Sequence, residues 1–256
     1  MDDNFNLMNR IVEWITEYAN LNNINTLVIG VSGGVDSAVT STLCAKTGID
    51  TIALNMPIHQ EESQKNLSEK HIEWLISSFD NVVGQEIDLT RTFDVLIDTD
   101  LGKNEISKLA KANTKARIRM AALYAISASN NGIVVGTGNK VEDFGVGFYT
   151  KYGDGGVDIS PIANLFKSEV YSLSESLGVI KEIRDAPPTD GLWDDGRTDE
   201  DQIGASYDEL EWAMRQPGDF SYDSLSKREK EVMEIYLKYR KTNLHKMKSI
   251  PVFSND

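Results

Sequence analysis

Two hydrophobic patterns alternate along this chain. Short, largely apolar runs predict buried strands, at residues 27–29, 51–57, 81–89 and 132–137. Apolar residues three or four positions apart predict amphipathic helices, at residues 5–20, 38–45, 61–78 and 105–127. Strands that alternate with helices in this way form parallel sheets covered by helices. The predicted fold class is therefore α/β, with an open, mostly parallel sheet flanked by helices on both faces.

The remainder of the chain combines helices with a long acidic connection. Residues 164–178 show helical spacing and end in glycine. Residues 184–204 are acidic and rich in proline and glycine, and loops of this length in compact domains are usually either lids or disordered. We expect this stretch to order over a bound nucleotide, with Thr189 reaching inward. Ser206–Glu209 and Ser226–Glu229 are capping boxes that predict the starts of two more helices.

Composition limits the class of protein. The 256 residues are 40% hydrophobic, which is enough for one globular domain over residues 1–256. No apolar run approaches the roughly 18 residues of a membrane span. The start of the chain, Met1–Asn4, has no signal-peptide pattern. The single cysteine, Cys44, excludes an internal disulfide, and we expect a reducing, cytoplasmic location.

The charge is uneven. A formal net charge of −14 argues against nucleic-acid binding. Residues 227–248 nevertheless hold eight Lys and Arg against three acids. Such a basic segment is either a solvated helix face or a source of cations for an anionic substrate.

The most specific chemistry lies in a glycine-rich stretch after the first predicted strand. It consists of Gly30, Val31, Ser32, Gly33, Gly34, Val35, Asp36 and Ser37. A strand, a glycine turn and a helix start direct backbone N–H groups and the helix dipole to one place, where an anion binds. The lysine of a Walker A loop is absent, and Asp36 stands instead. Because a carboxylate repels phosphate, we infer a Mg²⁺ ion between Asp36 and a polyphosphate.

A second polar segment, residues 136–142, follows the fourth predicted strand. Ligands of parallel sheets bind beyond the carboxyl ends of the strands, so this segment is expected beside the glycine-rich stretch. Thr137 and Glu142 would then lie at the bound nucleotide. Glu142 is a candidate second Mg²⁺ ligand opposite Asp36, since Mg²⁺ accepts one or two carboxylates together with phosphate oxygens.

Two other features are compatible with an anionic second substrate. Arg117 lies on the long predicted helix at 105–127 and shares a face with Asn113, whereas Arg119 points roughly opposite. For a single arginine a surface salt bridge is the simpler interpretation. Residues 148–161 are rich in glycine, charge and aromatic rings, which favours an ordered loop with Lys151 inward over a solvent-exposed connection.

The glycine-rich stretch resembles the pyrophosphate loop of the N-type ATP pyrophosphatases, which reads Ser-Gly-Gly-x-Asp-Ser. Further motifs, in order, make the chain similar to the ammonia-dependent NAD synthetases over nearly its whole length. They are Asn113-x-x-x-Arg117-x-Arg119-Met120, Gly136-Thr137-Gly138-Asn139-Lys140-x-Glu142, Thr150-Lys151-Tyr152-Gly153-Asp154-Gly155, Pro188-Thr189-x-Gly191-Leu192-Trp193, Thr198-Asp199-Glu200 and Gly204-x-x-Tyr207. Residues 143–147 are one residue longer than the family's usual spacing.

The resemblance implies a Rossmann-like fold of the adenine nucleotide α-hydrolase type and a role for individual residues. Asp36 and Lys167 would be catalytic, and Asp36 and Glu142 would bind Mg²⁺. ATP would contact the stretch from Gly30 to Ser37 together with Thr137, Lys167 and Thr189. Deamido-NAD would contact Arg117, Lys151, Asp158, His245 and Lys246. The family is a homodimer whose deamido-NAD sites lie at the subunit interface.

The reaction implied is the last step of NAD biosynthesis. The nicotinate carboxylate of deamido-NAD attacks the α-phosphorus of ATP, pyrophosphate leaves, and ammonia attacks the adenylated carbonyl to release AMP and NAD. No protein nucleophile is required. A glutamine-using enzyme would need a reactive thiol. Cys44 lies mid-helix, and the chain has no room for a glutaminase domain, so free ammonia is the expected donor.

Two other functions remain open at this point. One is an enzyme with the same loop that forms a different amide or modifies tRNA, although the net charge disfavours tRNA. A non-catalytic adenine-nucleotide sensor would need the loop but neither both carboxylates, Asp36 and Glu142, nor the second-substrate residues.

Overall fold

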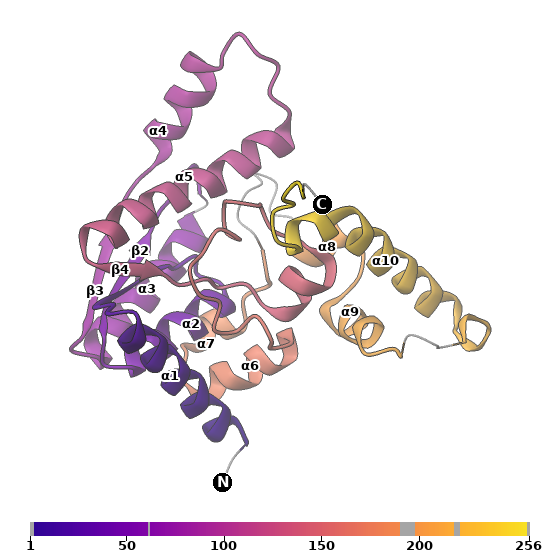
Figure 1. Cartoon of the computed structure of the whole chain (residues 1–256), viewed down its shortest axis with the longest axis horizontal. Helices are drawn as coiled ribbons and strands as arrows, with labels where there is room; N and C mark the ends of the chain where they lie inside the picture. Colours follow the sequence, from indigo (N-terminus) through magenta and orange to yellow (C-terminus); the bar gives the residue numbers. More distant parts are fainter. Residues whose placement is uncertain (1–2, 61, 190–197, 218–220, 255–256) are drawn as a thin grey trace.

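The computed structural model describes residues 3–60, 62–189, 198–217 and 221–254. Four parallel strands form the centre of the fold, and Figure 1 shows helices around them. The strands lie in the order β3-β2-β1-β4. Their bounds are Thr26–Gly30 for β1, Asp50–Asn55 for β2, Val82–Glu86 for β3 and Gly132–Val134 for β4.

The strand order creates a switch point between β1 and β4. The chain adds β2 and β3 on one side of β1, and then crosses back to add β4 on the other. Thr26 is in register with Asp50 on one side and with Gly132 on the other. The chain therefore leaves β1 and β4 at the same edge of the sheet and in opposite lateral directions, which is where parallel α/β sheets bind ligands.

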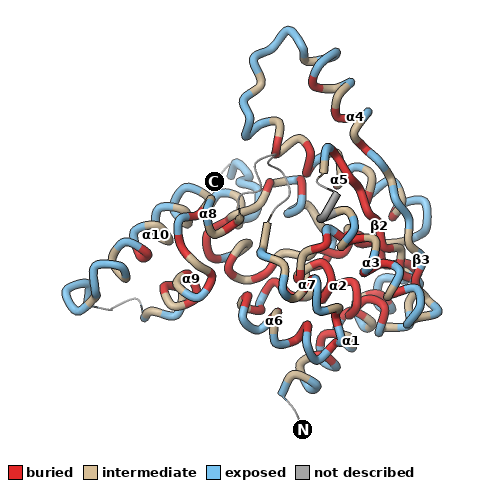
Figure 2. The backbone as a smooth tube through the Cα atoms, turned by 180° about the vertical axis from the view of Figure 1, so that it is seen from behind, coloured by how far each residue is buried: buried red, intermediate tan, exposed pale blue. Residues whose placement is uncertain are grey.

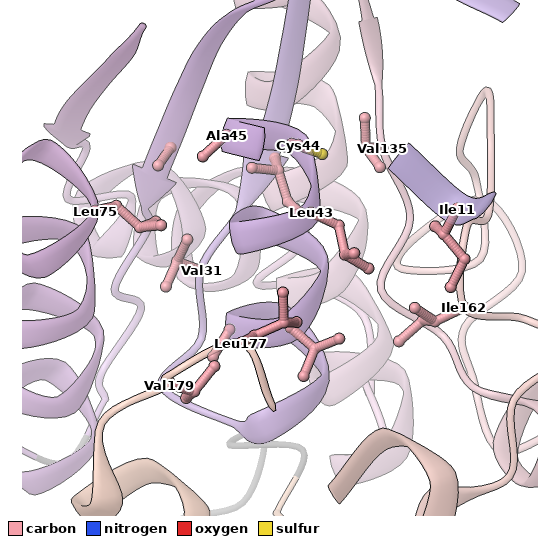
Figure 3. Packing of buried hydrophobic residues seen from close by; sticks show 14 of the residues in the cluster. Ile11, Val31, Leu43, Cys44, Ala45, Leu75, Val135, Ile162, Leu177 and Val179 are labelled. Carbon is pink, nitrogen blue, oxygen red and sulfur yellow. The ribbon is translucent and has the colours of Figure 1, made fainter. Parts of the chain in front are cut away.

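Alternating side chains divide the hydrophobic core between the two faces of the sheet. Leu27 and Ile29 belong to one cluster and Val28 to the other. The first face packs against α1 (Asp3–Leu21), α2 (Val35–Lys46), α3 (Glu62–Ser78) and α6 (Lys167–Ser176). Figure 3 shows part of this cluster, with Leu43, Leu75 and Ile162 buried around α2.

The second face packs against α5 (Lys108–Ser129), α4 (Thr90–Asp94) and the π-helix η1 (Val95–Asp100). Phe93, Met120 and Leu123 supply the helical side of this cluster. Residues 102–105 and Ser107, between η1 and α5, are exposed, as are residues 108–110 at the start of α5. The connection between η1 and α5 lies at the end of the projection seen in Figure 2.

A third hydrophobic cluster lies beside the sheet rather than on it. It joins the π-helix η2 (Lys140–Val146), α9 (Tyr207–Met214) and α10 (Lys227–Met247). Val146, Leu210 and Met233 are among its buried residues. Figure 1 shows α9 and α10 on the side of the molecule away from β3. The short helices α7 (Lys181–Arg184), α8 (Asp199–Ile203) and η3 (Tyr222–Ser224) complete the described elements.

The predicted fold class is confirmed, and the helices and strands expected from the pattern are present within a few residues of their predicted limits. Both predicted capping boxes form, and Ser206 and Ser226 each accept from the backbone three residues on. The α4–η1 segment was not predicted, because it is short and its apolar residues have no helical period long enough to detect. Strand β4 is shorter than predicted, and Val135 makes only an isolated bridge with Ile159.

The stretch predicted as a lid is described only at its ends. Residues 185–189 have no regular helix and α8 begins at Asp199, whereas residues 190–197 lie outside the described residues. Within the described ranges no helix is long and apolar enough to cross a membrane.

Candidate active site

The glycine-rich stretch forms a turn between β1 and α2. Gly33 has a φ of +86°, a conformation that favours glycine, and Gly34 is the N-cap of α2. Asp36 and Ser37 therefore lie in the first turn of α2, where the helix dipole is positive. The Ser32 and Ser37 hydroxyls lie 3.2 Å apart, and the Ser37 hydroxyl donates to the Gly34 carbonyl at 2.9 Å. The turn is thus held closed by its own side chains.

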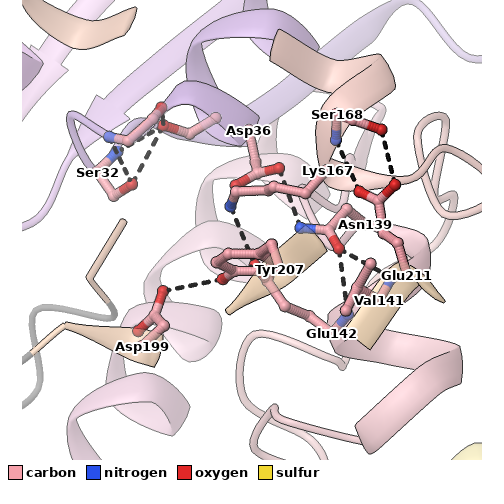
Figure 4. Close-up of polar contacts among 12 residues, drawn as sticks. Ser32, Asp36, Asn139, Val141, Glu142, Lys167, Ser168, Asp199, Tyr207 and Glu211 are labelled. Atoms are coloured by element: carbon pink, nitrogen blue, oxygen red, sulfur yellow. Dashed lines mark hydrogen bonds and ion pairs between the residues drawn. The ribbon is translucent and has the colours of Figure 1, made fainter. Parts of the chain in front are cut away.

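One lysine bridges the two predicted metal ligands (Figure 4). Lys167 Nζ lies 2.5 Å from Asp36 Oδ2 and 3.1 Å from Glu142 Oε1. The lysine side chain is 3% exposed, and the two carboxylates are 16% and 17% exposed. Asn139 Nδ2 donates to Asp36 Oδ1 at 3.1 Å, and Asn139 Oδ1 caps η2 by accepting from the Val141 and Glu142 N–H groups. The segments after β1 and β4 therefore meet as predicted.

Burial and charge act in opposite directions on these groups. Burial raises the pKa of Asp36, and Lys167 offsets part of that rise. For Glu142 burial also acts to raise the pKa, but Lys167, Tyr207 and Asn139 outweigh it, so the pKa is lowered. Burial acts to lower the pKa of Lys167, but the two carboxylates outweigh it and raise the pKa. The lysine therefore stays protonated, and its charge keeps Glu142 ionised.

Helix α9 supports this cluster from a direction that the sequence did not indicate. The Tyr207 hydroxyl donates to Glu142 Oε1 at 2.5 Å and lies 3.3 Å from Asp199 Oδ2. Glu211, one turn further along α9, accepts from the N–H and the hydroxyl of Ser168 at 2.9 Å and 2.7 Å. Sequence reasoning placed Tyr207 only in a family motif and a capping box, and Glu211 nowhere.

The cluster lines a cleft at the switch point between β1 and β4. Of the residues assigned to ATP, Thr137 and Thr189 line it, and so do Gly30, Val31, Ser32, Gly34, Val35 and Ser37. Gly33 is buried in the turn itself. Arg119 lines the cleft from α5, where its Nε donates to the Met56 carbonyl at 2.9 Å. Arg117, which the resemblance assigned to deamido-NAD, is exposed and donates to the Lys151 carbonyl at 3.3 Å.

The five residues assigned to the second substrate lie together only in part. Lys151 Nζ reaches the His245 carbonyl at 3.4 Å, which connects Arg117, Lys151 and the end of α10. Lys246 Nζ donates to the Gly147 and Tyr149 carbonyls. It lines a smaller cavity beside the main cleft.

Asp158, the fifth of these residues, lies on the other side of the same loop. It accepts from the Val134 N–H at 2.7 Å and from the Tyr124 hydroxyl at 3.0 Å. None of the five belongs to the described lining of the main cleft.

The donor set fits a hard cation that keeps other ligands. Among the described residues no group of three or more His, Cys, Asp or Glu could hold a metal ion. Asp36 and Glu142 nevertheless direct one oxygen atom each toward the same point. In this structure the ammonium of Lys167 lies at that point. Mg²⁺ commonly takes only one or two carboxylates and completes its shell with phosphate oxygens and water. The two carboxylates therefore fit Mg²⁺ that arrives with a polyphosphate.

Comparison with known proteins gives consistent matches over most of the chain. The family model described as NAD synthase matches residues 7–250. An NH(3)-dependent NAD(+) synthetase of Finegoldia magna is 35% identical over 223 residues, covering 86% of this chain and 89% of the relative. One from Methanocaldococcus jannaschii is 39% identical over 215 residues, 82% and 80% of the two chains. The solved NMN synthetase of Francisella tularensis has a TM-score of 0.86 and 31% identity, and the match covers 99% of each chain.

Proposed function

The chain belongs to the NAD synthase family, and we propose that it uses ATP to join ammonia to the carboxylate of deamido-NAD, giving NAD, AMP and pyrophosphate. The observation that carries this proposal is the bridge from Asp36 through Lys167 to Glu142 at the switch point. It places two anions and one cation beside a helix N-terminus. This arrangement suits the transfer of the adenylyl group of ATP to a carboxylate, with pyrophosphate as the leaving group.

Each residue of the bridge has a part in this reaction. The N–H groups of the turn at Gly33 and Gly34 bind the departing pyrophosphate together with the start of α2. Lys167, protonated and buried, neutralises charge that develops on the phosphate oxygens. Thr137 and Thr189, which both line the cleft, contact ATP.

We assign Mg²⁺ to Asp36 and Glu142. When bound, the ion neutralises the phosphate charge and orients the leaving pyrophosphate. Asn139 keeps Asp36 in place by donating to its other oxygen, and the same amide caps the helix that carries Glu142.

The second substrate is assigned to residues in and around the loop at 148–161. Arg117, Lys151, Asp158, His245 and Lys246 are proposed to bind deamido-NAD. Since none of them is in the described lining of the main cleft, this assignment includes the homodimer implied by the resemblance, in which a second copy completes the site. The proposal also includes one catalytic domain without a glutaminase, free ammonia as donor, and a cytoplasmic location. Cys44 is buried and its pKa is raised to about 12 by burial, which is unsuited to a glutaminase nucleophile.

A second candidate function has a specific observation in its favour. The NMN synthetase match covers 99% of both chains at 31% identity. NMN lacks the adenylyl half of NAD, but the carboxylate that becomes an amide is the same. The Asp36–Lys167–Glu142 bridge would therefore serve both reactions, and contacts remote from the carboxylate decide between them.

One experiment tests the two candidates together. Purified protein is mixed with ATP, Mg²⁺ and ammonium, and with either deamido-NAD or nicotinate mononucleotide. Chromatography then measures AMP and the amide product. Equal amounts of AMP and NAD from deamido-NAD, at a higher kcat/KM than for the mononucleotide, support the proposal. The opposite preference supports the second candidate, and absence of AMP with both refutes the reaction.

A further inference from the structure

Tyr207 contacts two of the three charged groups of the site, although it is not in the described lining of the cleft. Its hydroxyl donates to Glu142 Oε1 at 2.5 Å, and Lys167 Nζ lies 4.6 Å from the centre of its ring. The residue is 5% exposed. Because it is separated from the cleft, any effect it has on the reaction passes through the groups that it contacts there, which are Glu142, Lys167 and Asp199.

We propose that Tyr207 is a positioning residue, whose hydroxyl fixes the carboxylate of Glu142 and whose ring confines the ammonium of Lys167. The inference rests on the proposed role of Asp36 and Glu142 at Mg²⁺. In this inference, helix α9 fixes the positions of Glu142 and Lys167 before the nucleotide binds.

The backbone around Tyr207 is itself fixed, which a positioning role requires. The Ser206 hydroxyl caps α9 by accepting from the Glu209 N–H at 3.2 Å. In turn, the Glu209 carboxylate accepts from the Ser206 N–H at 2.9 Å. The Tyr207 N–H donates to Glu200 Oε1 at 2.8 Å. Both ends of the tyrosine are therefore bonded.

Glu211 extends the same support to Lys167. It lies one turn after Tyr207 and so on the same side of α9. It is 5% exposed and accepts from both the N–H and the hydroxyl of Ser168, the residue after Lys167. One face of α9 thus contacts the carboxylate on η2 and the first turn of α6, as Figure 4 shows.

This arrangement matters because Glu142 and Lys167 belong to different parts of the core. Glu142 lies on η2 in the third hydrophobic cluster, whereas α6 packs with the sheet. A short hydroxyl bond to one oxygen restricts the movement of the Glu142 carboxylate, and the charge on the acceptor makes that bond strong. Loss of such a partner behind a metal ligand typically lowers metal affinity by about 10- to 100-fold.

The test compares Tyr207→Phe with Tyr239→Phe. The Tyr239 hydroxyl donates to the Gln202 carbonyl at 3.0 Å and packs in the same third cluster, away from the bridge. Binding of Mn²⁺ in the presence of α,β-methylene-ATP, which is not cleaved at the α-phosphorus, is measured by electron paramagnetic resonance. Tyr207→Phe should weaken Mn²⁺ binding about tenfold. Tyr239→Phe should bind Mn²⁺ as the wild type does.

Kinetics provide the second readout. In Tyr207→Phe the Mg²⁺ concentration for half-maximal rate should rise by a similar factor, with the KM for deamido-NAD unchanged. If both variants lose thermal stability equally and neither changes Mn²⁺ affinity, Tyr207 has only a structural role and the inference is wrong. A wild type that binds no Mn²⁺–nucleotide would instead refute the proposed function.

If Tyr207→Phe does not fold, Ser206→Ala is used in its place in the same Mn²⁺ binding measurement. This change leaves every side chain of the bridge in place and loosens only the start of α9. It should shift Mn²⁺ affinity in the same direction by about twofold, and an unchanged affinity in a variant with a destabilised α9 contradicts the inference.

Discussion

Replacing Lys167 with methionine removes the charge between two carboxylates while it keeps most of the side-chain volume. The lysine side chain is 3% exposed, and the carboxylates of Asp36 and Glu142 are 16% and 17% exposed. Removing one partner of a buried ion pair costs about 3–5 kcal/mol. Because water in the cleft reaches both carboxylates, we expect the lower end, about 3 kcal/mol. At about 2–4 °C per kcal/mol for a protein of this size, Tm should fall by about 6–12 °C.

Thermal unfolding with and without Mg²⁺ is the assay. In Lys167→Met the two carboxylates are left to bind a divalent cation without competition. Mg²⁺ at 100 times its Kd would return about 2.7 kcal/mol. The wild type should gain much less from Mg²⁺ alone, since the ammonium of Lys167 occupies the same point.

Lys181→Met is the matched control, because that side chain is 77% exposed and lies 3.8 Å from Asp185. It should unfold within about 1 °C of the wild type, as an exposed pair contributes little. The reasoning is refuted if Lys167→Met unfolds within that same margin. It is also refuted if Mg²⁺ raises the Tm of the wild type and of Lys167→Met equally.

Three further outcomes follow from other parts of the structure. Asp36→Asn should reduce pyrophosphate release by about 10²-fold or more, measured with a coupled pyrophosphatase assay; a variant with normal turnover would contradict the metal role. Burial lowers the pKa of His71 to about 4, so the unfolded chain takes up a proton first and stability should fall as pH drops from about 6.5 to 4, by up to about 3 kcal/mol. Urea unfolding should show this loss in the wild type and not in a folded His71→Phe variant. Gly147 has a φ of +67°, and an added Cβ would lie 2.5 Å from Asn243 Cβ, so Gly147→Ala should cost about 1–3 kcal/mol in the same experiment, and an unchanged urea midpoint would argue against strain at this contact.

The part of the site that follows from strand and loop order was predictable from the sequence. Asp36 and Glu142 each follow a strand of a parallel sheet, and all strands of such a sheet end at one edge. From that rule alone, the two carboxylates were expected to lie close together. Lys167 came from the family resemblance, because the start of a distant helix has no local signal that points to the same edge.

Helix rotation and packing decided what the sequence could not. Arg117 and Arg119 are two positions apart, so they point to nearly opposite sides of α5. Because Met120 and Leu123 pack against the sheet, Arg119 faces the cleft and Arg117 is exposed. Tyr207 was missed for a related reason. A capping-box pattern predicts where a helix starts but not which distant carboxylate its first side chain will meet.

The third hydrophobic cluster has a consequence for the order in which a new chain matures. Asp36, Glu142 and Lys167 all precede residue 180, whereas α9 and α10, which bury η2, follow it and are synthesised later. A chain still on the ribosome can form its sheet and its nucleotide turn first, since domains fold from the N-terminal side as they emerge. Its second carboxylate then has neither the tyrosine nor the apolar partners that hold it. The carboxylate of Glu142 therefore gains its tyrosine and its apolar neighbours only when α9 and α10 dock.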